Sequence, residues 1–361
     1  MQSAIIRENI LNDFNVKTVS YKGSKRKLLS HIVGLAKEVE ANLVFDGFSG
    51  TGIVGAALRN AGCTVLANDL NFSSYIYGRV FLEGFEQKAV SKHIEVMNNL
   101  NPKEGWLTQN YSGTVNRKVR GTDSMFDRPL GLIRKNAMRL DAARDYIENI
   151  TGLDERTRNA LVFSVIRACD VVFNNSNDQK SSFKEWTKKS LKDVRLESPS
   201  LVEGPTGTQY KGDIYSINIP EVDFIYFDPP YTHGVLYASC YHLNDSIALW
   251  DKSSLVTSYA VPRPERATFR GKEPGAFYSK KRVEEDFRRL LTKYKAPRVV
   301  LSYSDAPRNT ISIERLQDIC SEFGNLDVRT IDHKICTQNN SMKKHSDKLK
   351  EYFIIIDSVY N

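Results

Sequence analysis

Four consecutive residues, Asp228-Pro229-Pro230-Tyr231, close the apolar run 222–228, which is typical of a buried strand. The two prolines fix φ and remove two backbone N–H donors, so the backbone there offers carbonyl acceptors beside a carboxylate and an aromatic ring. These groups suit a planar ligand that carries an NH2 group. The carboxyl end of a strand is also where open α/β sheets bind ligands. The alternative is a strand that simply stops at prolines and is capped by an aspartate.

A second group of chemically useful residues is the glycine-rich turn between the apolar run 42–46 and the helical pattern 51–61. It reads Asp46-Gly47-Phe48-Ser49-Gly50-Thr51-Gly52. Glycines let a backbone turn tightly and approach a ligand closely. Asp69 ends the next apolar run, where a carboxylate can accept hydrogen bonds from ribose hydroxyls. The turn keeps only part of the dinucleotide-binding pattern and lacks the P-loop lysine, so a nucleoside site and a tight structural turn both remain open.

These two groups need a sheet that brings the ends of their strands together. Short apolar runs alternate with amphipathic stretches, which predicts an α/β fold in which helices cover a sheet. The further strands are expected at 222–228, 297–302, 327–332 and 351–356, and helices at 283–294 and 313–323. No helix is evident between the last two strands, so we expect an otherwise parallel sheet with an antiparallel edge strand.

The middle of the chain has a different pattern. Helical periodicity dominates there, notably at 90–100, 130–150 and 156–173, and polar, loop-like stretches lie between these segments. We therefore expect residues 84–209 to form an inserted, mainly helical subdomain. Residues 1–83 and 210–361 would together form the domain that contains the sheet.

The composition of the 361 residues narrows the class of protein. Hydrophobic residues make up 41% and charged residues 26%, which excludes a wholly disordered chain. The sequence shows no apolar run long enough for a membrane helix and no secretory signal, so we expect a cytoplasmic protein. Five scattered cysteines and two separated histidines, His233 and His242, give no ligand pattern, so we expect no metal. The net charge of +8 fits nucleic acid as a partner, or merely a basic surface.

Taken together, the motifs resemble those of the Dam-like, Asp-Pro-Pro-Tyr group of amino-methyltransferases that act on DNA adenine. In that group the cofactor motif comes first, a target-recognition region follows, and the catalytic motif comes last. Tyr21-Lys22-Gly23-Ser24-Lys25 resembles the family's N-terminal cofactor motif, and Gly212-Asp213-Ile214 resembles its adenine-reading motif. Tyr237 and the runs 241–243 and 301–303 resemble stretches of restriction-associated members. The resemblance covers roughly 21–83 and 210–358.

The resemblance implies a Rossmann-like class I methyltransferase fold with S-adenosylmethionine as the cofactor. Residues 84–209 would then be the target-recognition subdomain. The glycine turn would hold the methionine end, Lys25 would lie near its carboxylate, Asp69 would bind the ribose and Asp213 the adenine amine. The implied cofactor residues are Tyr21, Lys25, Asp46, Phe48, Ser49, Gly50, Thr51, Gly52, Asp69 and Asp213.

The implied reaction is in-line methyl transfer to the exocyclic amine of an adenine flipped out of double-stranded DNA. Its catalytic residues would be Asp228, Pro229, Pro230 and Tyr231. Asp228 and the Pro229 carbonyl would accept the two amino hydrogens and so make the nitrogen more nucleophilic by positioning and electrostatic preorganisation. Tyr231 would stack on the extruded base. A restriction–modification or related defence system is the implied setting, with a cognate restriction endonuclease as a further partner.

Two basic segments, 262–282 and 334–350, follow predicted strands and are candidates for contacts with DNA phosphates. The residues selected as DNA contacts are Arg263, Arg266, Arg270, Lys272, Lys343 and Lys344. A charge run is otherwise a solvated loop.

Two other functions fit the same motifs. The first is a related enzyme that acts on RNA adenine or DNA cytosine, although Asp228 favours adenine, since cytosine-modifying relatives more often carry serine there. The second is a non-catalytic nucleic-acid-binding subunit that keeps the fold. Intact Asp69 and Asp228 and the glycine turn argue against it.

Overall fold

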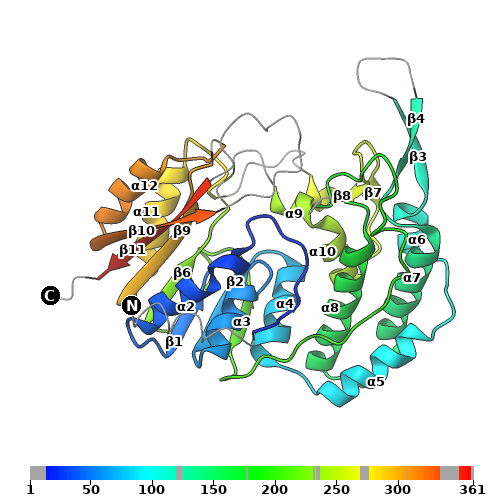
Figure 1. Ribbon diagram of the computed structural model, residues 1–361, viewed down its shortest axis with the longest axis horizontal. Helices are drawn as coiled ribbons and strands as arrows, with labels where there is room; N and C mark the ends of the chain where they lie inside the picture. The colour runs from blue at the N-terminus through cyan, green and yellow to red at the C-terminus, as the bar shows by residue number, and fades with distance from the viewer. Residues whose placement is uncertain are drawn as a thin grey trace.

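The computed structural model describes residues 14–118, 125–175, 178–230, 232, 236–268, 276–306, 308–333 and 349–358. Its centre is a seven-stranded mixed sheet with the strand order β10-β11-β9-β6-β1-β2-β5 (Figure 1). The strands are β1 (Leu43–Asp46), β2 (Thr64–Asp69), β5 (Thr208–Lys211), β6 (Phe224–Phe227), β9 (Arg298–Ser304), β10 (Asn325–His333) and β11 (Leu349–Asp357). All neighbouring strands are parallel except that β11 runs antiparallel to both β9 and β10.

The mostly parallel sheet is as predicted, but the antiparallel strand is not the edge strand that we expected. The chain first forms β10 at the edge and then returns as β11 between β10 and β9. The reason lies in the side chains. β11 is apolar on both faces, as in the buried pair Ile354 and Ile355, whereas β10 carries the exposed ion pair of Asp327 and Arg329. Charged side chains are typical of an edge strand because they discourage pairing with other chains.

Alternate strand residues face two different layers of helices, as the two-residue repeat of a strand requires. Val44 and Tyr226 belong to the hydrophobic cluster on one face, and Phe45 and Phe227 belong to the cluster on the other. The first face is covered by α2 (Leu29–Lys37), α3 (Ile53–Asn60) and α4 (Phe72–Glu83), and the second by α11 (Val283–Lys293) and α12 (Ile313–Ser321) (Figure 1). The result is a three-layer α/β domain.

The middle region is mainly helical, as the sequence predicts, but it shares its core with the sheet domain. Its elements are α5 (Gln87–Asn98), α6 (Trp106–Tyr111), β3 (Thr114–Lys118), β4 (Met125–Pro129), α7 (Arg134–Asn149) and α8 (Glu155–Val172). Phe163 of α8 packs edge-on against Tyr77 and Phe81 of α4, with ring centroids 5.4 and 5.2 Å apart. One hydrophobic cluster therefore extends from the sheet through α4 into this region. The hairpin β3–β4 projects from it (Figure 1).

Short elements follow the Asp-Pro-Pro-Tyr motif and pack against the middle region. They are α9 (Tyr237–Cys240), α10 (His242–Leu249), β7 (Leu255–Val256) and β8 (Arg263–Pro264). Gln179 of the middle region caps the start of α10, because its Oε1 accepts hydrogen bonds from the backbone N–H groups of Leu243 (2.9 Å) and Asn244 (3.3 Å). Such a cap satisfies donors that a helix N-terminus leaves without partners.

The other end of α10 is also held by the middle region. The fully buried Arg144 of α7 donates hydrogen bonds to the carbonyl oxygens of Ile247 (2.7 Å) and Ala248 (3.2 Å). Both ends of α10 thus depend on side chains from residues 84–209. In the part of the chain that the structure describes, every helix is too short or too polar to cross a lipid bilayer.

Candidate active site

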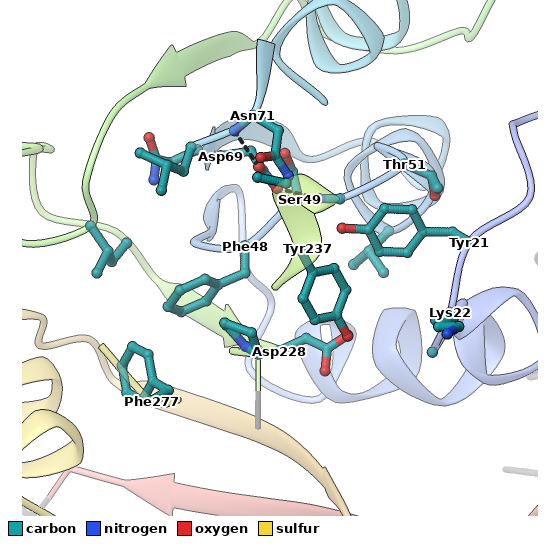
Figure 2. Close-up of a pocket in the computed structure, with 18 of the residues that line it drawn as sticks. Tyr21, Lys22, Phe48, Ser49, Thr51, Asp69, Asn71, Asp228, Tyr237 and Phe277 are labelled. Atoms are coloured by element: carbon teal, nitrogen blue, oxygen red, sulfur yellow. Dashed lines mark hydrogen bonds between the residues drawn. The ribbon is translucent and has the colours of Figure 1, made fainter. Parts of the chain in front are cut away.

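The Asp-Pro-Pro-Tyr motif and the glycine turn follow two neighbouring parallel strands, β6 and β1. The strand order reverses here, because β2 pairs with one side of β1 and β6 with the other. Open α/β sheets bind ligands in the crevice at such a switch point. The described residues enclose a cavity of about 310 Å³ there, a size typical of small-molecule sites. Asp228 and Asp69 both line this cavity (Figure 2).

The glycine turn has a left-handed backbone at two positions. Gly50 and Gly52 have φ angles of +51° and +73°, which residues with a side chain rarely adopt. A Cβ atom on Gly52 would lie 3.0 Å from the Phe81 ring, and one on Gly50 would lie 3.3 Å from the Tyr21 ring. These glycines are therefore needed both for the turn and for the close packing around it.

Asp69 connects this turn to the end of β2. Its Oδ2 accepts a hydrogen bond from the Gly50 N–H (2.8 Å), and its Oδ1 accepts one from the Asn71 N–H (2.9 Å; Figure 2). Burial raises the pKa of Asp69 to about 6, although these hydrogen bonds oppose the rise. Each carboxylate oxygen has a further lone pair. Asp69 can therefore hold the turn and accept hydrogen bonds from a ligand at the same time.

Lys25 also lines the cavity, but it is held by carboxylates of the protein itself. Its Nζ lies 2.8 Å from Asp228 Oδ2 and 3.2 Å from Glu351 Oε1, and its side chain is only 6% exposed. The resemblance implied that Lys25 lies near the carboxylate of the cofactor, and this role stays a prediction. In the structure two acids hold the ammonium group. Burial raises the pKa of Asp228 to about 6, and Lys25 limits the rise. Asp228 is thus ionised at neutral pH.

Asp46 is the last residue of β1 and the first of the glycine turn, and it does not line the cavity. Its two carboxyl oxygens are buried and have no hydrogen bond of good geometry to the described residues. Burial and then the charges of Asp228 and Asp69 raise the pKa of Asp46 to about 8. Asp46 is therefore largely protonated at neutral pH, and the negative charge of this region comes from the carboxylates of Asp69 and Asp228. Such surroundings favour a positively charged ligand.

Aromatic rings form part of the cavity wall. The rings of Tyr21 and Tyr237 lie 5.7 Å apart, and Phe48 packs edge-on against Phe277 at 5.6 Å. In Figure 2 the ring of Tyr237 stands between Asp69 and Asp228. Sequence analysis did not assign four of the lining aromatics to the site: Tyr226, Tyr237, Phe277 and Tyr278. In the sequence these residues lie close to the catalytic motif or in the aromatic part of a basic segment, and this position could have identified them.

The structure brings most of the expected site residues together. Those that line the cavity are Tyr21, Lys25, Phe48, Ser49, Gly50, Thr51, Asp69, Asp213, Asp228 and Pro230. Gly52 and Pro229 are not part of the lining, and Tyr231 lies outside the described residues. Asp213 follows β5 and accepts a hydrogen bond from the Tyr215 N–H (2.8 Å), which fixes the turn at this side of the cavity.

Of the six residues expected to contact DNA, the structure describes Arg263 and Arg266. Arg270, Lys272, Lys343 and Lys344 lie outside the described residues. Arg263 is 4% exposed, its guanidinium donates to Ser239 Oγ and to the Lys180 carbonyl oxygen (2.9 Å), and it stacks over Tyr259. The expectation that Arg263 binds DNA is therefore wrong, because its charge is used inside the protein.

Arg266 is only partly available as a DNA contact. Its side chain is 33% exposed and its Nη1 lies 2.8 Å from Asp251 Oδ2. Further hydrogen bonds join it to Ser253 (2.7 Å) and Ser246 (3.1 Å). The structure gives Arg266 a role in holding the loop after α10, and this role competes with phosphate binding.

Replacing Arg263 with alanine should destabilise the protein without weakening its binding to DNA. The substitution leaves the Lys180 carbonyl and the Ser239 hydroxyl without their partner, and we expect a loss of about 2 kcal/mol in the free energy of unfolding. Urea unfolding measures this loss. Fluorescence anisotropy with a DNA duplex should give an unchanged slope of log affinity against log salt, because no phosphate contact is removed. A slope reduced by about one would restore Arg263 to the interface.

His242 is a packing residue. It is 1% exposed and its Nε2 lies 3.0 Å from the carbonyl oxygen of Gln179. Burial lowers its pKa to about 3, so the ring is neutral at physiological pH. His233 lies outside the described residues. In the described ranges, His, Cys, Asp and Glu side chains do not gather in any group of three that could hold a metal ion.

Comparison with known proteins gives relatives along nearly the whole chain. The type II methyltransferase M.NlaIII of Neisseria lactamica is 28% identical over 360 residues, which cover 95% of this chain and 100% of the relative. The modification methylase StsI of Streptococcus sanguinis is 26% identical and the type II methyltransferase M.FokI of Planomicrobium okeanokoites 27% identical. These alignments cover 90% and 84% of this chain but only 50% and 46% of the two relatives.

A family model and a solved structure were also found. The magnesium protoporphyrin IX methyltransferase of Synechocystis PCC 6803 superposes over 99% of this chain with a TM-score of 0.37 and 9% identity, too remote a likeness to bear on function. Residues 21–259, which include the glycine turn and the Asp-Pro-Pro-Tyr motif, match the model of one family. Among the alternatives drawn from the sequence, that match favours adenine over cytosine and DNA over RNA. The chain belongs to the D12 class N6 adenine-specific DNA methyltransferase family.

Proposed function

We propose that the cavity between β1 and β6 binds S-adenosylmethionine and that Asp228 receives the amino group of a flipped adenine beside it. As a D12 class enzyme, the chain is a sequence-specific adenine DNA methyltransferase. The observation that carries the proposal for its site is the position of Asp228, which lines the same cavity as Asp69 and the glycine turn. A methyl donor and an acceptor amine held there would be within reach of each other.

The residues around the cavity fit this cofactor by charge and by shape. When bound, S-adenosylmethionine supplies a methyl group activated by a positively charged sulfur. The carboxylates of Asp69 and Asp228, which are largely ionised at neutral pH, provide electronegative surroundings for a cation. Asp69 would accept hydrogen bonds from the ribose hydroxyls while it holds the Gly50 N–H, and Asp213 would accept a hydrogen bond from the cofactor's adenine amine.

Asp228 would act on the substrate amine by accepting a hydrogen bond. An adenine amino group is a poor nucleophile, because its lone pair is delocalised into the ring. With its two N–H groups held by the Asp228 carboxylate and the Pro229 carbonyl, the nitrogen can move toward tetrahedral geometry and attack. As the new N–C bond forms, the bond between the methyl group and the sulfur would break and leave a neutral thioether. The nitrogen becomes cationic and its proton can pass to the carboxylate. Lys25 keeps that carboxylate oriented throughout.

The setting and the DNA contacts extend this proposal. We assign base readout to residues 84–209, with the hairpin β3–β4 as its most projecting element (Figure 1). The names of the relatives support a place in a restriction–modification system with a cognate endonuclease. The reaction would take place where the DNA is, which for such systems is the cytoplasm. Flipping the base out of the helix is required, because the amine is otherwise inside the stack.

The test uses the purified chain with tritiated S-adenosylmethionine and unmethylated DNA of diverse sequence. After digestion to nucleosides, the label should appear in N6-methyldeoxyadenosine. Label in cytosine, or label only when RNA replaces DNA, would assign the alternative substrates. No label in adenine on any DNA would contradict the proposal. Sequencing of modified bases in DNA from cells that express the chain then gives the recognised sequence.

A further inference from the structure

A second buried carboxylate lies behind the proposed catalytic aspartate. Glu351 is on the antiparallel strand β11, next to the edge strand β10, and its side chain is only 7% exposed. Its Oε1 lies 3.2 Å from Lys25 Nζ and accepts a hydrogen bond from Ser302 Oγ (2.6 Å) on the neighbouring strand β9. Glu351 does not line the cavity. Its direct ion pair with a residue that lines the cavity is the one with Lys25.

Lys25 is shared between two acids rather than paired with one. Its ammonium group has contacts of 2.8 Å to Asp228 Oδ2 and 2.9 Å to Asp228 Oδ1, besides the contact to Glu351. The three side chains carry a net charge of −1 when all are ionised. A buried group of this kind is costly unless each member is well paired. Its place beside the cavity points to a role in the reaction.

The sharing matters because Asp228 must do two things. It has to stay ionised, for which it needs a cation, and it has to offer its oxygens to the adenine N–H groups. A lysine bound to Asp228 alone would compete strongly with the substrate for those oxygens. A second carboxylate on the other side of the ammonium group draws part of that hydrogen bonding away. The hydrogen bond from Ser302 Oγ fixes the position of this second carboxylate, Glu351.

We propose that Glu351 is a positioning residue for methyl transfer, which holds Lys25 from behind and so keeps the Asp228 carboxylate available to the substrate amine. This inference rests on the role proposed above for Asp228. Nothing in the Asp-Pro-Pro-Tyr motif or the cofactor motif points to it, because Glu351 lies on a strand near the end of the chain and acts across the sheet.

The charged groups around Asp228 predict how the pH dependence should respond. Lys25 from the segment before α2, Asp46 from β1 and Glu351 from β11 face it. Burial is the main cause of its raised pKa, of about 6, and the negative charge of Glu351 adds to it, whereas Lys25 lowers it. Removing the charge of Glu351 should therefore lower the pKa of Asp228. Activity that needs the Asp228 carboxylate would then persist to more acidic pH.

The experiment compares the wild-type chain with Glu351→Gln, which keeps the size of the side chain. Methylation is measured at saturating S-adenosylmethionine, so that kcat/KM for DNA against pH reports the enzyme–cofactor complex. We expect kcat to fall about 10- to 100-fold, as for a slightly misplaced catalytic group. The KM values for DNA and cofactor should stay the same, because Glu351 contacts neither. The acid limb of the profile is the fall in kcat/KM at low pH, and in the wild type its midpoint should lie near pH 6. In Glu351→Gln this midpoint should move down by roughly one pH unit.

Asp357→Asn is the matched control. Asp357 lies on the same strand and the same face, six residues or about 20 Å further along, and its partner Arg298 keeps Glu38 as a second acid. This variant loses the same charge and should keep the wild-type kcat and acid limb. If Glu351→Gln does not fold, Ser302→Ala serves instead. This variant keeps the charge of Glu351 but removes the hydrogen bond that fixes its side chain. We therefore expect kcat to fall by roughly fivefold while the midpoint of the acid limb stays the same.

The outcomes distinguish a failure of the proposed function from a failure of the role proposed for Glu351. A wild-type chain without adenine methylation would contradict the proposed function itself. An active wild type, with a folded Glu351→Gln variant that keeps kcat and the acid limb, would overturn only the role of Glu351. The same conclusion follows if that variant does not fold and Ser302→Ala turns over like the wild type. A rise in KM with unchanged kcat would also reject a positioning role.

Discussion

Replacing Asp228 with asparagine should lower kcat for adenine methylation by about 10²- to 10³-fold, while DNA and cofactor binding stay close to the wild type. The amide keeps the size of the side chain but loses the charge that stabilises the developing positive charge on the amine. The fold should survive, because Lys25 retains Glu351 as a partner at 3.2 Å. Single-turnover kinetics with excess enzyme measures the chemical step without interference from product release.

The control for this variant is a carboxylate that does a purely structural job. Asp223 precedes β6, and its Oδ2 accepts hydrogen bonds from the backbone N–H groups of Asn42 (2.9 Å) and Leu43 (2.8 Å). Asp223→Asn should lose some stability but keep its turnover. Near-wild-type turnover by Asp228→Asn would remove Asp228 from the reaction. If Asp228→Asn loses methylation but still binds DNA, the alternative of a non-catalytic nucleic-acid-binding subunit is excluded.

Replacing Asp69 with asparagine should weaken S-adenosylmethionine binding by about 10- to 100-fold, the loss expected for hydrogen bonds to a charged group. The variant also disturbs the glycine turn, since Asp69 accepts the Gly50 N–H at 2.8 Å. Isothermal titration calorimetry with S-adenosylmethionine measures the change. Binding should also weaken as the pH falls through about 6 in the wild type, because the raised pKa of Asp69 marks where its carboxylate takes up a proton.

Asp223→Asn is again the matched control for Asp69→Asn, since each carboxylate accepts two backbone N–H groups next to a strand. Only Asp69 lies on the cavity. Both variants should lose similar stability, whereas cofactor affinity should change in Asp69→Asn alone. Equal affinity in the two variants would show that Asp69 does not contact the cofactor.

The sequence was sufficient to predict the sheet and the two motifs that meet at its centre. Apolar runs marked β1, β2, β6 and β9 to within a few residues, because strands buried on both faces are continuously hydrophobic. It missed the short strand β5, which is Thr-Gln-Tyr-Lys and has no such run. It also placed the antiparallel strand at the edge, because strand order depends on pairing across the sheet rather than on local pattern.

The roles of charged residues were the least predictable part of the site. Arg263 belongs to a basic segment, yet the fold buries it against Ser239 and Lys180, and local charge counts contain no information about burial. Lys25 was correctly placed at the cavity, but its partners Asp228 and Glu351 come from strands far along the chain. Long-range ion pairs of this kind can be seen only once the topology is known.

The glutamine that caps α10 limits how a relative of this enzyme can acquire a new target sequence. Gln179 belongs to the region assigned to base readout, but it holds the first turn of α10, which comes after the short helix α9 that contains the cavity residue Tyr237. A recombination event that replaces the whole readout region would uncap that helix unless the incoming segment brings an equivalent acceptor. Changes of specificity in this architecture are therefore constrained to spare residues near 179, and exchange of the region as an independent cassette would disturb the methylating centre.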